Sequence, residues 1–499
     1  MDIYLVVIIL YLVFLVGVGV VKSRGVKDQE GFMVAGRSVS ATFLVATLVC
    51  TWIGSGSLFG GAGRAYREGF SALWMSAGAW VGIAIVYFLA PRVRRIAQYT
   101  VPDILEMRYT PAARVLGTLA IVIAYLTIAS YQFMGGGRLL HILVPSIDPS
   151  TGRLFACAFV VVVIALAGMR SIVSVDLING IMITLGILIA APIALSAAGG
   201  WSGLTTTLPE THFTTFGNIG WASCLGLFFP TLFLLLGESG MYQKFMSARS
   251  EIDAKKAVIG MIVGVIVVET VLDSVAIFGA GVHWGSAPFQ GAEGMDRATT
   301  ETIILFMARH DMPTLAGVIL LVGAVAIIFS TATTFLIVPS TNITRDLYQR
   351  FINPQASQKG MVLFQRLTIV VLAAVSLIVT NFFTNVLDMA LYAYTMVGAA
   401  VTPALLVAFL SRRVTPIAGT VSVAAGMLAT IVFGALNQLG WEELPLGFGL
   451  ALPLDYDYIV YPAATASLLS LVLVSLFTPA PSEEKWRPFW AKAAQAKAD

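Results

Sequence analysis

The chain has 499 residues, of which 58% are hydrophobic and only 11% are charged, and its formal net charge is +3. A chain this apolar cannot cover its surface with polar side chains, so the composition excludes an ordinary water-soluble protein and indicates a lipid environment. The small positive charge gives no reason to expect a nucleic-acid partner.

Uncharged runs near the length that a helix needs to cross a bilayer recur along the whole chain. A hydrocarbon core of ~30 Å takes about 20 apolar residues per helix. We therefore expect an all-α membrane protein with about 13 transmembrane helices. The predicted spans cover residues 3–21, 40–66, 71–91, 115–143, 154–169, 172–198, 219–243, 257–282, 313–343, 367–383, 385–411, 415–437 and 458–478.

The basic residues indicate how these spans are oriented, because Lys and Arg near span ends are retained on the cytoplasmic side. With the N-terminus outside, most of the 30 basic residues fall inside, including those within 22–37, 92–114 and 244–256. The opposite orientation would place most of these basic residues outside. We expect a multi-pass protein of the plasma (inner) membrane with a cytoplasmic C-terminus.

Two predicted spans contain residues that interrupt helices. The second contains WIGSGS at 52–57, and the seventh contains FFPT at 228–231. If spans 2–6 and 7–11 form two five-helix units, each break lies in the first helix of its unit, and the odd helix number inverts one unit relative to the other. Paired breaks of this kind are typical of a transporter's central binding site, although Gly and Pro also serve close helix packing.

Three short segments carry a family resemblance. They are AGMRS at 167–171 with Asp176 after it, YQKFMSARS at 242–250, and the adjacent Ser330 and Thr331. They resemble, in order, the Gly-Gly-hydrophobe-x-small signature, with alanine in place of the first glycine, the Gln-Arg…Ala-Lys-Ser segment and the hydroxyl pair of the sodium:solute symporters. That family includes proline, pantothenate, sugar and choline transporters.

The resemblance implies the leucine-transporter fold, an inverted five-plus-five repeat with one helix before it and two after. It also implies sodium-coupled symport of a small organic solute by alternating access, without enzymatic activity or an organic cofactor, by a chain that functions as a monomer in the bilayer. The implied divisions are 1–38 for the extra helix and cytoplasmic loop, 39–198 for the first repeat, 199–218 for an extracellular loop, 219–411 for the second repeat and 412–499 for the last two helices and tail.

A sodium site is expected at the first break, because carbonyls freed by a broken helix supply oxygens without fixed charge. The family pattern implies a ligand set of the carbonyls of Cys50, Ile53 and Ile327, the hydroxyls of Ser330 and Thr331, and Asp176 as the balancing charge. The alternative for the hydroxyls is back-bonding to a carbonyl one turn earlier.

The solute site is expected to include Glu238, which lies in LLGESG at 235–240, because a carboxylate in hydrocarbon is expensive. Trp52 matches a tryptophan of the choline branch, and an indole with a carboxylate suits an amine or a quaternary ammonium; a zwitterionic amino acid fits as well. Alternatively, Trp52 packs and Glu238 pairs with Lys244 or carries a coupling proton. Further wall positions are Ser57, Tyr131, Gln132, Thr231, Tyr392 and Tyr394.

Glu269 and Asp273 stand four residues apart on the eighth span and so share a helix face, where they repel unless paired, protonated or wet. Arg138 is a possible partner. The pair is also the only candidate for an intramembrane enzyme, and no motif supports it; an ion channel is expected to show a repeated pore segment or a charged ring. The cysteines and histidines have no zinc or disulfide spacing, so no metal beyond sodium is expected.

Overall fold

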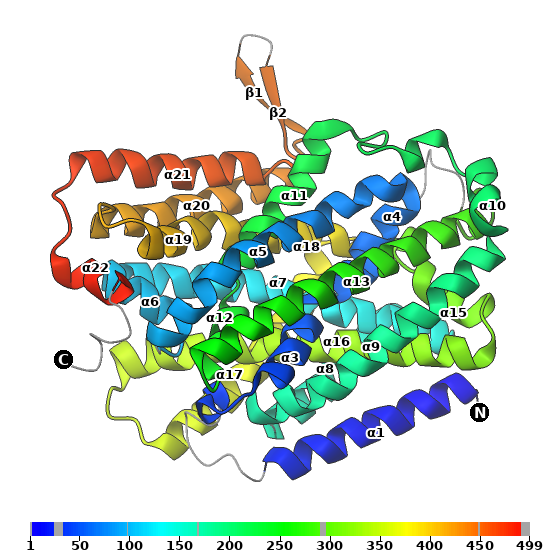
Figure 1. Ribbon diagram of the computed structural model, residues 1–499, viewed down its shortest axis with the longest axis horizontal. Helices are drawn as coiled ribbons and strands as arrows, with labels where there is room; N and C mark the ends of the chain where they lie inside the picture. The colour runs from blue at the N-terminus through cyan, green and yellow to red at the C-terminus, as the bar shows by residue number, and fades with distance from the viewer. Residues whose placement is uncertain are drawn as a thin grey trace.

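The computed structural model describes residues 2–23, 33–96, 98–166, 169–289, 296–447 and 450–490. Ala167 and Gly168 of the signature-like segment lie outside these residues. Figure 1 shows a bundle of long helices lying side by side, with one short β-hairpin projecting from it.

The first half of the chain forms six predicted spans, each present as a helix or as a broken helix. They are α1 (Ile3–Ser23), α3 (Ala41–Trp52) with η2 (Gly56–Gly61) and α4 (Ala62–Glu68), α5 (Leu73–Ile96), α7 (Pro111–Leu143), α8 (Pro149–Leu166) and α9 (Met169–Ala197).

The second half forms the other seven. They are α11 (Gly220–Gly237) with α12 (Ser239–Ser247), α13 (Glu251–His283), α16 (Thr314–Asn342), α17 (Gln358–Val379), α18 (Val386–Ala400) with α19 (Thr402–Leu410), α20 (Pro416–Gln438) and α21 (Val460–Phe477). All predicted spans therefore have helical counterparts.

Shorter elements at the ends of the spans, between them and after the last one were not predicted separately. They are η1 (Ala35–Arg37), η3 (Gly69–Ala72), α6 (Val101–Arg108), α10 (Gly200–Thr207), η4 (Glu210–Phe213), α14 (Arg297–Thr300), α15 (Ile303–His310), η5 (Ile343–Ile352), η6 (Thr380–Phe382), the antiparallel strands β1 (Glu443–Gly447) and β2 (Leu450–Pro453), and α22 (Glu483–Trp490).

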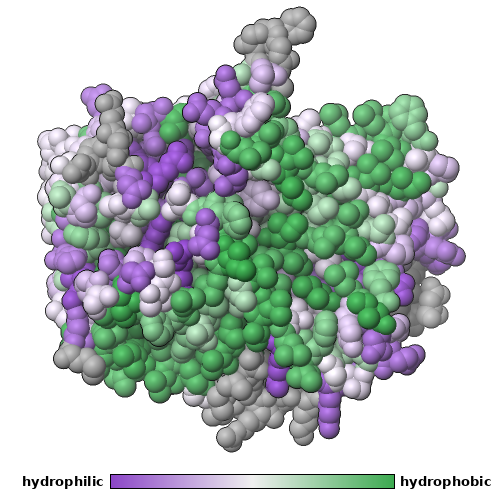
Figure 2. Space-filling model, turned by 180° about the vertical axis from the view of Figure 1, so that it is seen from behind, coloured by the Kyte–Doolittle hydropathy of each residue, from purple (hydrophilic) through white to green (hydrophobic). Residues whose placement is uncertain are grey.

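Ten helical segments of the described residues are long and apolar enough to cross a membrane, and three further apolar helices are shorter. The count of thirteen crossings stays a prediction. Large apolar side chains such as Phe88, Leu315 and Phe477 are exposed on the helices. In Figure 2 hydrophobic surface covers the middle of the view, and hydrophilic side chains gather mainly towards its margins. This distribution suits a lipid-facing belt between two polar ends.

Helix α16 forms the centre of the bundle. Its most apolar stretch is 89% buried, and it packs against α9, α7 and α3. On the other side of α3, α13 packs against α3, α5 and α9. The broken first helix of the repeat is therefore enclosed between α16 and α13.

The first predicted break is confirmed. Helix α3 ends at Trp52, and Ile53 has the extended backbone angles φ −74° and ψ 100°. A Cβ on Gly54 would lie 3.0 Å from Gln132 Nε2, so glycine permits a close approach of α7. The amide N–H of Ser55, freed by the break, donates to Gln132 Oε1 at 2.9 Å. A buried side chain thus replaces the missing helical partner.

The second break is present, but its predicted position was wrong. Pro230 lies inside α11, which is continuous to Gly237, and the interruption comes at Glu238 with ψ 104°. Proline removes a single backbone hydrogen bond, and membrane helices tolerate that loss where neighbouring groups compensate. At the actual break, a Cβ on Gly237 would lie 2.1 Å from Thr402 Oγ1, so a close helix contact fixes the position.

Candidate sodium and solute sites

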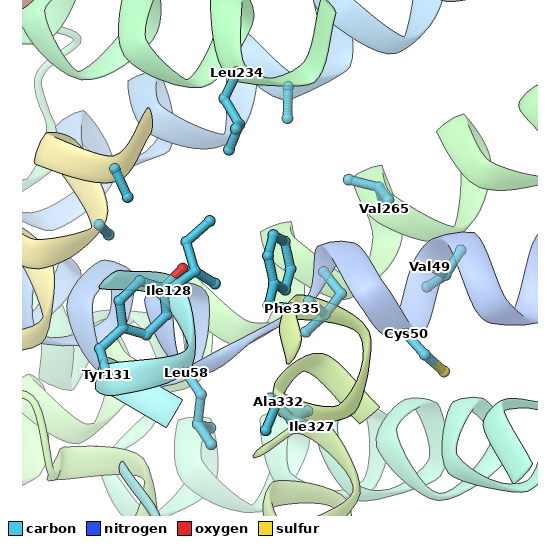
Figure 3. Close-up of a cluster of buried hydrophobic side chains, with 14 of the residues drawn as sticks. Val49, Cys50, Leu58, Ile128, Tyr131, Leu234, Val265, Ile327, Ala332 and Phe335 are labelled. Carbon is cyan, nitrogen blue, oxygen red and sulfur yellow. The ribbon is translucent and has the colours of Figure 1, made fainter. Parts of the chain in front are cut away.

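The carbonyl groups at the first break face a hydroxyl group of α16. Thr331 Oγ1 lies 3.3 Å from the carbonyl oxygen of Cys50 and 3.1 Å from that of Ile53. Ile327 lies one turn earlier on α16. Figure 3 shows the apolar side chains around this region, with Cys50 and Tyr131 on either side of Phe335 in the view. Three oxygens from two helices thus converge beside the break.

Asp176 lies next to this group and is only 1% exposed. Its Oδ1 accepts a hydrogen bond from Ser330 Oγ at 2.6 Å, and its Oδ2 accepts one from Thr47 Oγ1 at 2.5 Å. Both hydroxyls of the α16 pair therefore bond across to other helices, and the back-bonding alternative is wrong. The structure thus brings together five of the six residues predicted for sodium, namely Cys50, Ile53, Asp176, Ser330 and Thr331, and Ile327 lies one turn before Thr331 on α16.

Lys244 was counted among the cytoplasmic basic residues and was given as a possible partner of Glu238. It is fully buried, and its Nζ donates to the carbonyl of Thr47 at 2.9 Å and to the Thr51 hydroxyl. Thr47 therefore bonds Lys244 through its carbonyl and Asp176 through its hydroxyl. The ammonium group also interacts electrostatically with Asp176 and Glu238. The family-like YQKFMSARS segment drew attention to this region of the sequence. It could not show that the Lys244 side chain contacts α3 next to the break, because that contact joins residues about 200 positions apart.

Glu238 caps α12. Its carboxylate accepts hydrogen bonds from the amide of Gly240 at 2.9 Å, from the amide of Met241 and from the Tyr125 hydroxyl. Among the described residues it forms no direct ion pair with Lys244, although both line a cavity of about 10 Å³, roughly one water molecule in size. The cap gives this carboxylate a structural reason to be in the membrane.

Trp52 and Ser57, predicted for the solute site, both contact Glu269. Trp52 Nε1 donates to Glu269 Oε1 at 2.9 Å, and Ser57 Oγ lies 3.4 Å from the same oxygen. Asp273 Oδ2 accepts from Ser76 Oγ at 3.3 Å. The suggested partner of this acidic pair was wrong, because Arg138 pairs with Glu301.

The two predicted tyrosines also meet at the break. Tyr131 and Tyr394 share a hydrogen bond between their hydroxyls, and a Cβ on Gly56 would lie 2.7 Å from the Tyr394 hydroxyl. Thr231 instead bonds back to the carbonyl of Leu227 at 2.9 Å. Tyr392 packs against Phe383 and Tyr456. The Gln132 side chain accepts the Ser55 amide at the first break.

A helical membrane bundle with two interrupted helices, carbonyls at one break and buried carboxylates beside it defines a secondary transporter. Residues 32–426 match the family model described as "Sodium:solute symporter family". The chain belongs to this family.

Curated relatives are similar over nearly the whole chain. The osmoregulated proline transporter OpuE of Bacillus subtilis is 24% identical over 493 residues, which cover 96% of both chains. The high-affinity proline transporter PutP of the same organism is 24% identical over 481 residues, covering 93% of this chain and 96% of the relative. The sodium/proline symporter of Staphylococcus aureus is 25% identical over 504 residues, covering 95% and 93%.

Solved structures show the same fold. A Na+-coupled sialic acid symporter in a substrate-bound outward-open state has a TM-score of 0.78 at 16% identity, covering 96% of this chain and 99% of the other. Mhp1, a nucleobase-cation-symport-1 family transporter, has a TM-score of 0.55 at 12% identity, covering 93% and 99%. The chain thus has the leucine-transporter fold, and its function is sodium-coupled symport of a small solute rather than enzyme catalysis.

Proposed function

We propose that sodium and the solute bind on opposite sides of the first helix break. Sodium is held on the α16 side by the carbonyls of Cys50, Ile53 and Ile327 and the hydroxyls of Ser330 and Thr331, with Asp176 as the balancing charge. The observation that carries the proposal is the contact of Thr331 Oγ1 with both break carbonyls. Carbonyl and hydroxyl oxygens are the ligands that a hard cation prefers.

The solute side of the break faces α13. Trp52 and Ser57 contact Glu269 there, and Tyr131 with Tyr394 approaches Gly56. Thr231 and Glu238 were predicted for this side from the sequence; because Thr231 bonds back to Leu227 and Glu238 caps α12, we assign both to structural roles instead. The solute is a small organic molecule; the similar proteins named above include transporters of proline, a zwitterion.

The shared break accounts for coupling. Ile53, whose carbonyl is a proposed sodium ligand, directly follows Trp52, whose indole is on the solute side. An ion that holds the Ile53 carbonyl in place thereby restricts where Trp52 can lie. Sodium shifts the equilibrium towards the solute-binding state only to the extent that it binds that state more tightly.

We also infer the orientation and the repeat divisions given by the sequence, with the N-terminus outside, and a monomer as the functional unit. One observation supports the grouping of the basic residues. Arg114, Arg345 and Arg350, all assigned to the cytoplasmic side, share the carboxylates of Asp103 and Glu106.

The sodium site is tested by removing both hydroxyls together. The double variant Ser330→Ala with Thr331→Ala is expected to raise the half-saturating sodium concentration by well over tenfold, because two ligands are lost and water replaces them only partly. Sodium titration of uptake in reconstituted vesicles measures this value. An unchanged sodium requirement would remove both hydroxyls from the site.

Removing the charge of Lys244 is expected to change the half-saturating sodium concentration in the opposite direction. Lys244→Met is expected to lower the half-saturating sodium concentration about three- to tenfold, because a neighbouring positive charge repels a cation at an effective dielectric near 20. Sodium titration of thermal stability measures it, with Lys256→Met, at an exposed site on α13, as the control. A weaker sodium response would show that the lysine supports the site's structure instead.

A further inference from the structure

We propose that Glu269 and Asp273 bind the positively charged nitrogen of the transported solute, which makes that solute an organic ammonium compound without a carboxylate of its own. The proposal rests on the solute site proposed above and names its substrate class.

Burial makes this acidic pair unusual. Each side chain is 4% exposed, and both lie on one face of α13, which packs against α4 and α5 (Figure 1). No ion pair formed by the described residues includes either carboxylate. Buried carboxylates without a cationic partner are strongly unfavourable, so the pair requires a cation that arrives from outside the protein or a bound proton.

The two oxygens of the Glu269 carboxylate are bonded unequally. Oε1 accepts from Trp52 Nε1, whereas Oε2 is buried and has no hydrogen-bond partner. The indole N–H of Trp80 faces the same carboxylate and interacts with it, although the geometry is looser than that of the Trp52 bond. Buried polar atoms are almost always paired, and this indole N–H can satisfy the remaining oxygen. The group that the described residues do not supply is therefore a positive charge and not a hydrogen-bond donor.

Asp273 extends the acidic surface towards the break. Its Oδ1 lies 3.4 Å from the position of a Cβ on Gly61, the last residue of η2, which is ordinary van der Waals contact. Asp273 therefore lies beside η2, one helical turn along α13 from Glu269.

Aromatic side chains complete a setting for a cation. The indole N–H groups of Trp52 and Trp80 both face the Glu269 carboxylate, and the Tyr394 hydroxyl lies at Gly56, next to Ser57, which also contacts Glu269. Indole and phenol faces attract ammonium groups most strongly where water is excluded. Because no basic side chain of the described residues pairs with this acidic group, a solute carboxylate would meet repulsion here, and a zwitterion such as proline fits poorly.

The first experiment needs only the unmodified full-length protein. Thermal stability is measured in saturating sodium with choline, putrescine and proline as probes. Choline or putrescine is expected to stabilise the protein, and at least a tenfold higher concentration of proline is expected to be needed for the same shift. Stabilisation by proline but by neither amine would overturn the proposal, as would the absence of any amine effect.

The second experiment removes the charges one at a time. Glu269→Gln and Asp273→Asn are each expected to weaken amine binding at least tenfold and to leave sodium-induced stabilisation without solute within about threefold. Glu442→Gln removes an exposed carboxylate and is expected to change neither value. Unchanged amine affinity in both acidic-pair variants would sink the proposal.

Two outcomes separate this inference from the proposed sodium site. In the first outcome, Ser330→Ala/Thr331→Ala loses its sodium response and the unmodified protein prefers zwitterions to amines. This result supports the proposed sodium site and overturns the proposal that the solute is an ammonium compound. In the second outcome, uptake requires Glu269 and depends on pH, but no amine stabilises the protein. This result assigns Glu269 and Asp273 to proton coupling and also overturns the proposal of an ammonium solute.

Discussion

Asp176→Asn is expected to raise the sodium concentration for half-maximal uptake by about a hundredfold. The amide keeps the shape of the carboxylate and can still accept from Ser330 or Thr47, but it deletes the negative charge beside the ion. Losing a charge-assisted contact in a buried site costs about 1.5–3 kcal/mol, and each ~1.4 kcal/mol is tenfold in affinity. Sodium titration of uptake in reconstituted vesicles measures the change.

Solute affinity at saturating sodium should fall much less in this variant, because no solute contact is altered. Asp148→Asn is a matched control, since it removes an exposed carboxylate that receives the amides of Ser150 and Thr151, and asparagine serves the same turn. Native sodium dependence in Asp176→Asn would leave the aspartate as a buried acceptor for two hydroxyls and nothing more.

The first helix break could be predicted from a local pattern, because the glycine-rich interruption at 52–57 marks freed carbonyls. Ser330 and Thr331 could not be assigned locally, since hydroxyls in membrane helices also bond back to the preceding turn. The family resemblance supplied the pairing between α3, α9 and α16. The structure adds two contacts that no local pattern contains. Gln132 accepts the Ser55 amide at the break, and Thr47 is hydrogen-bonded to both Lys244 and Asp176.

The second break shows why position is harder to predict than existence. Proline at 230 is a strong local signal, but a membrane helix continues through a single missing hydrogen bond. The real interruption depends on Thr402, over 160 residues away, whose hydroxyl occupies the space beside Gly237 and lies 2.6 Å from the carbonyl of Phe233. Contacts of this range are not encoded in any window of the sequence.

Arg138 illustrates the same limit for charges. Its pairing with Glu269 or Asp273 was consistent with span order, yet it bonds Glu301, whose carboxylate also accepts the amides of Val386 and Leu387 at the start of α18. In this position the Glu301 carboxylate accepts the free amides at a helix N-terminus and balances the charge of Arg138. Arg138 is therefore not the partner of the acidic pair of α13, and no other base within the described part of the chain forms an ion pair with it.

Glu238→Gln is expected to lower the melting temperature markedly and to leave solute affinity unchanged. The carboxylate accepts two backbone amides at the start of α12 and the hydroxyl of Tyr125, all buried. Hydrogen bonds to a charged acceptor contribute about 1.5–3 kcal/mol, and an amide keeps only part of that, since one of its two polar atoms is a donor. The loss should therefore appear in the stability of the α11–α12 break.

Three measurements on this one variant separate the roles that Glu238 can have. A cap predicts a lower melting temperature with native solute affinity and native pH dependence. Solute recognition predicts at least a tenfold loss of affinity for a cationic or zwitterionic solute, while sodium-induced stabilisation persists. Proton coupling predicts loss of the pH dependence of uptake with exchange of preloaded solute retained, because a permanently neutral side chain resembles the protonated acid. A native melting temperature combined with either of the last two results would contradict the assignment of Glu238 as a helix cap.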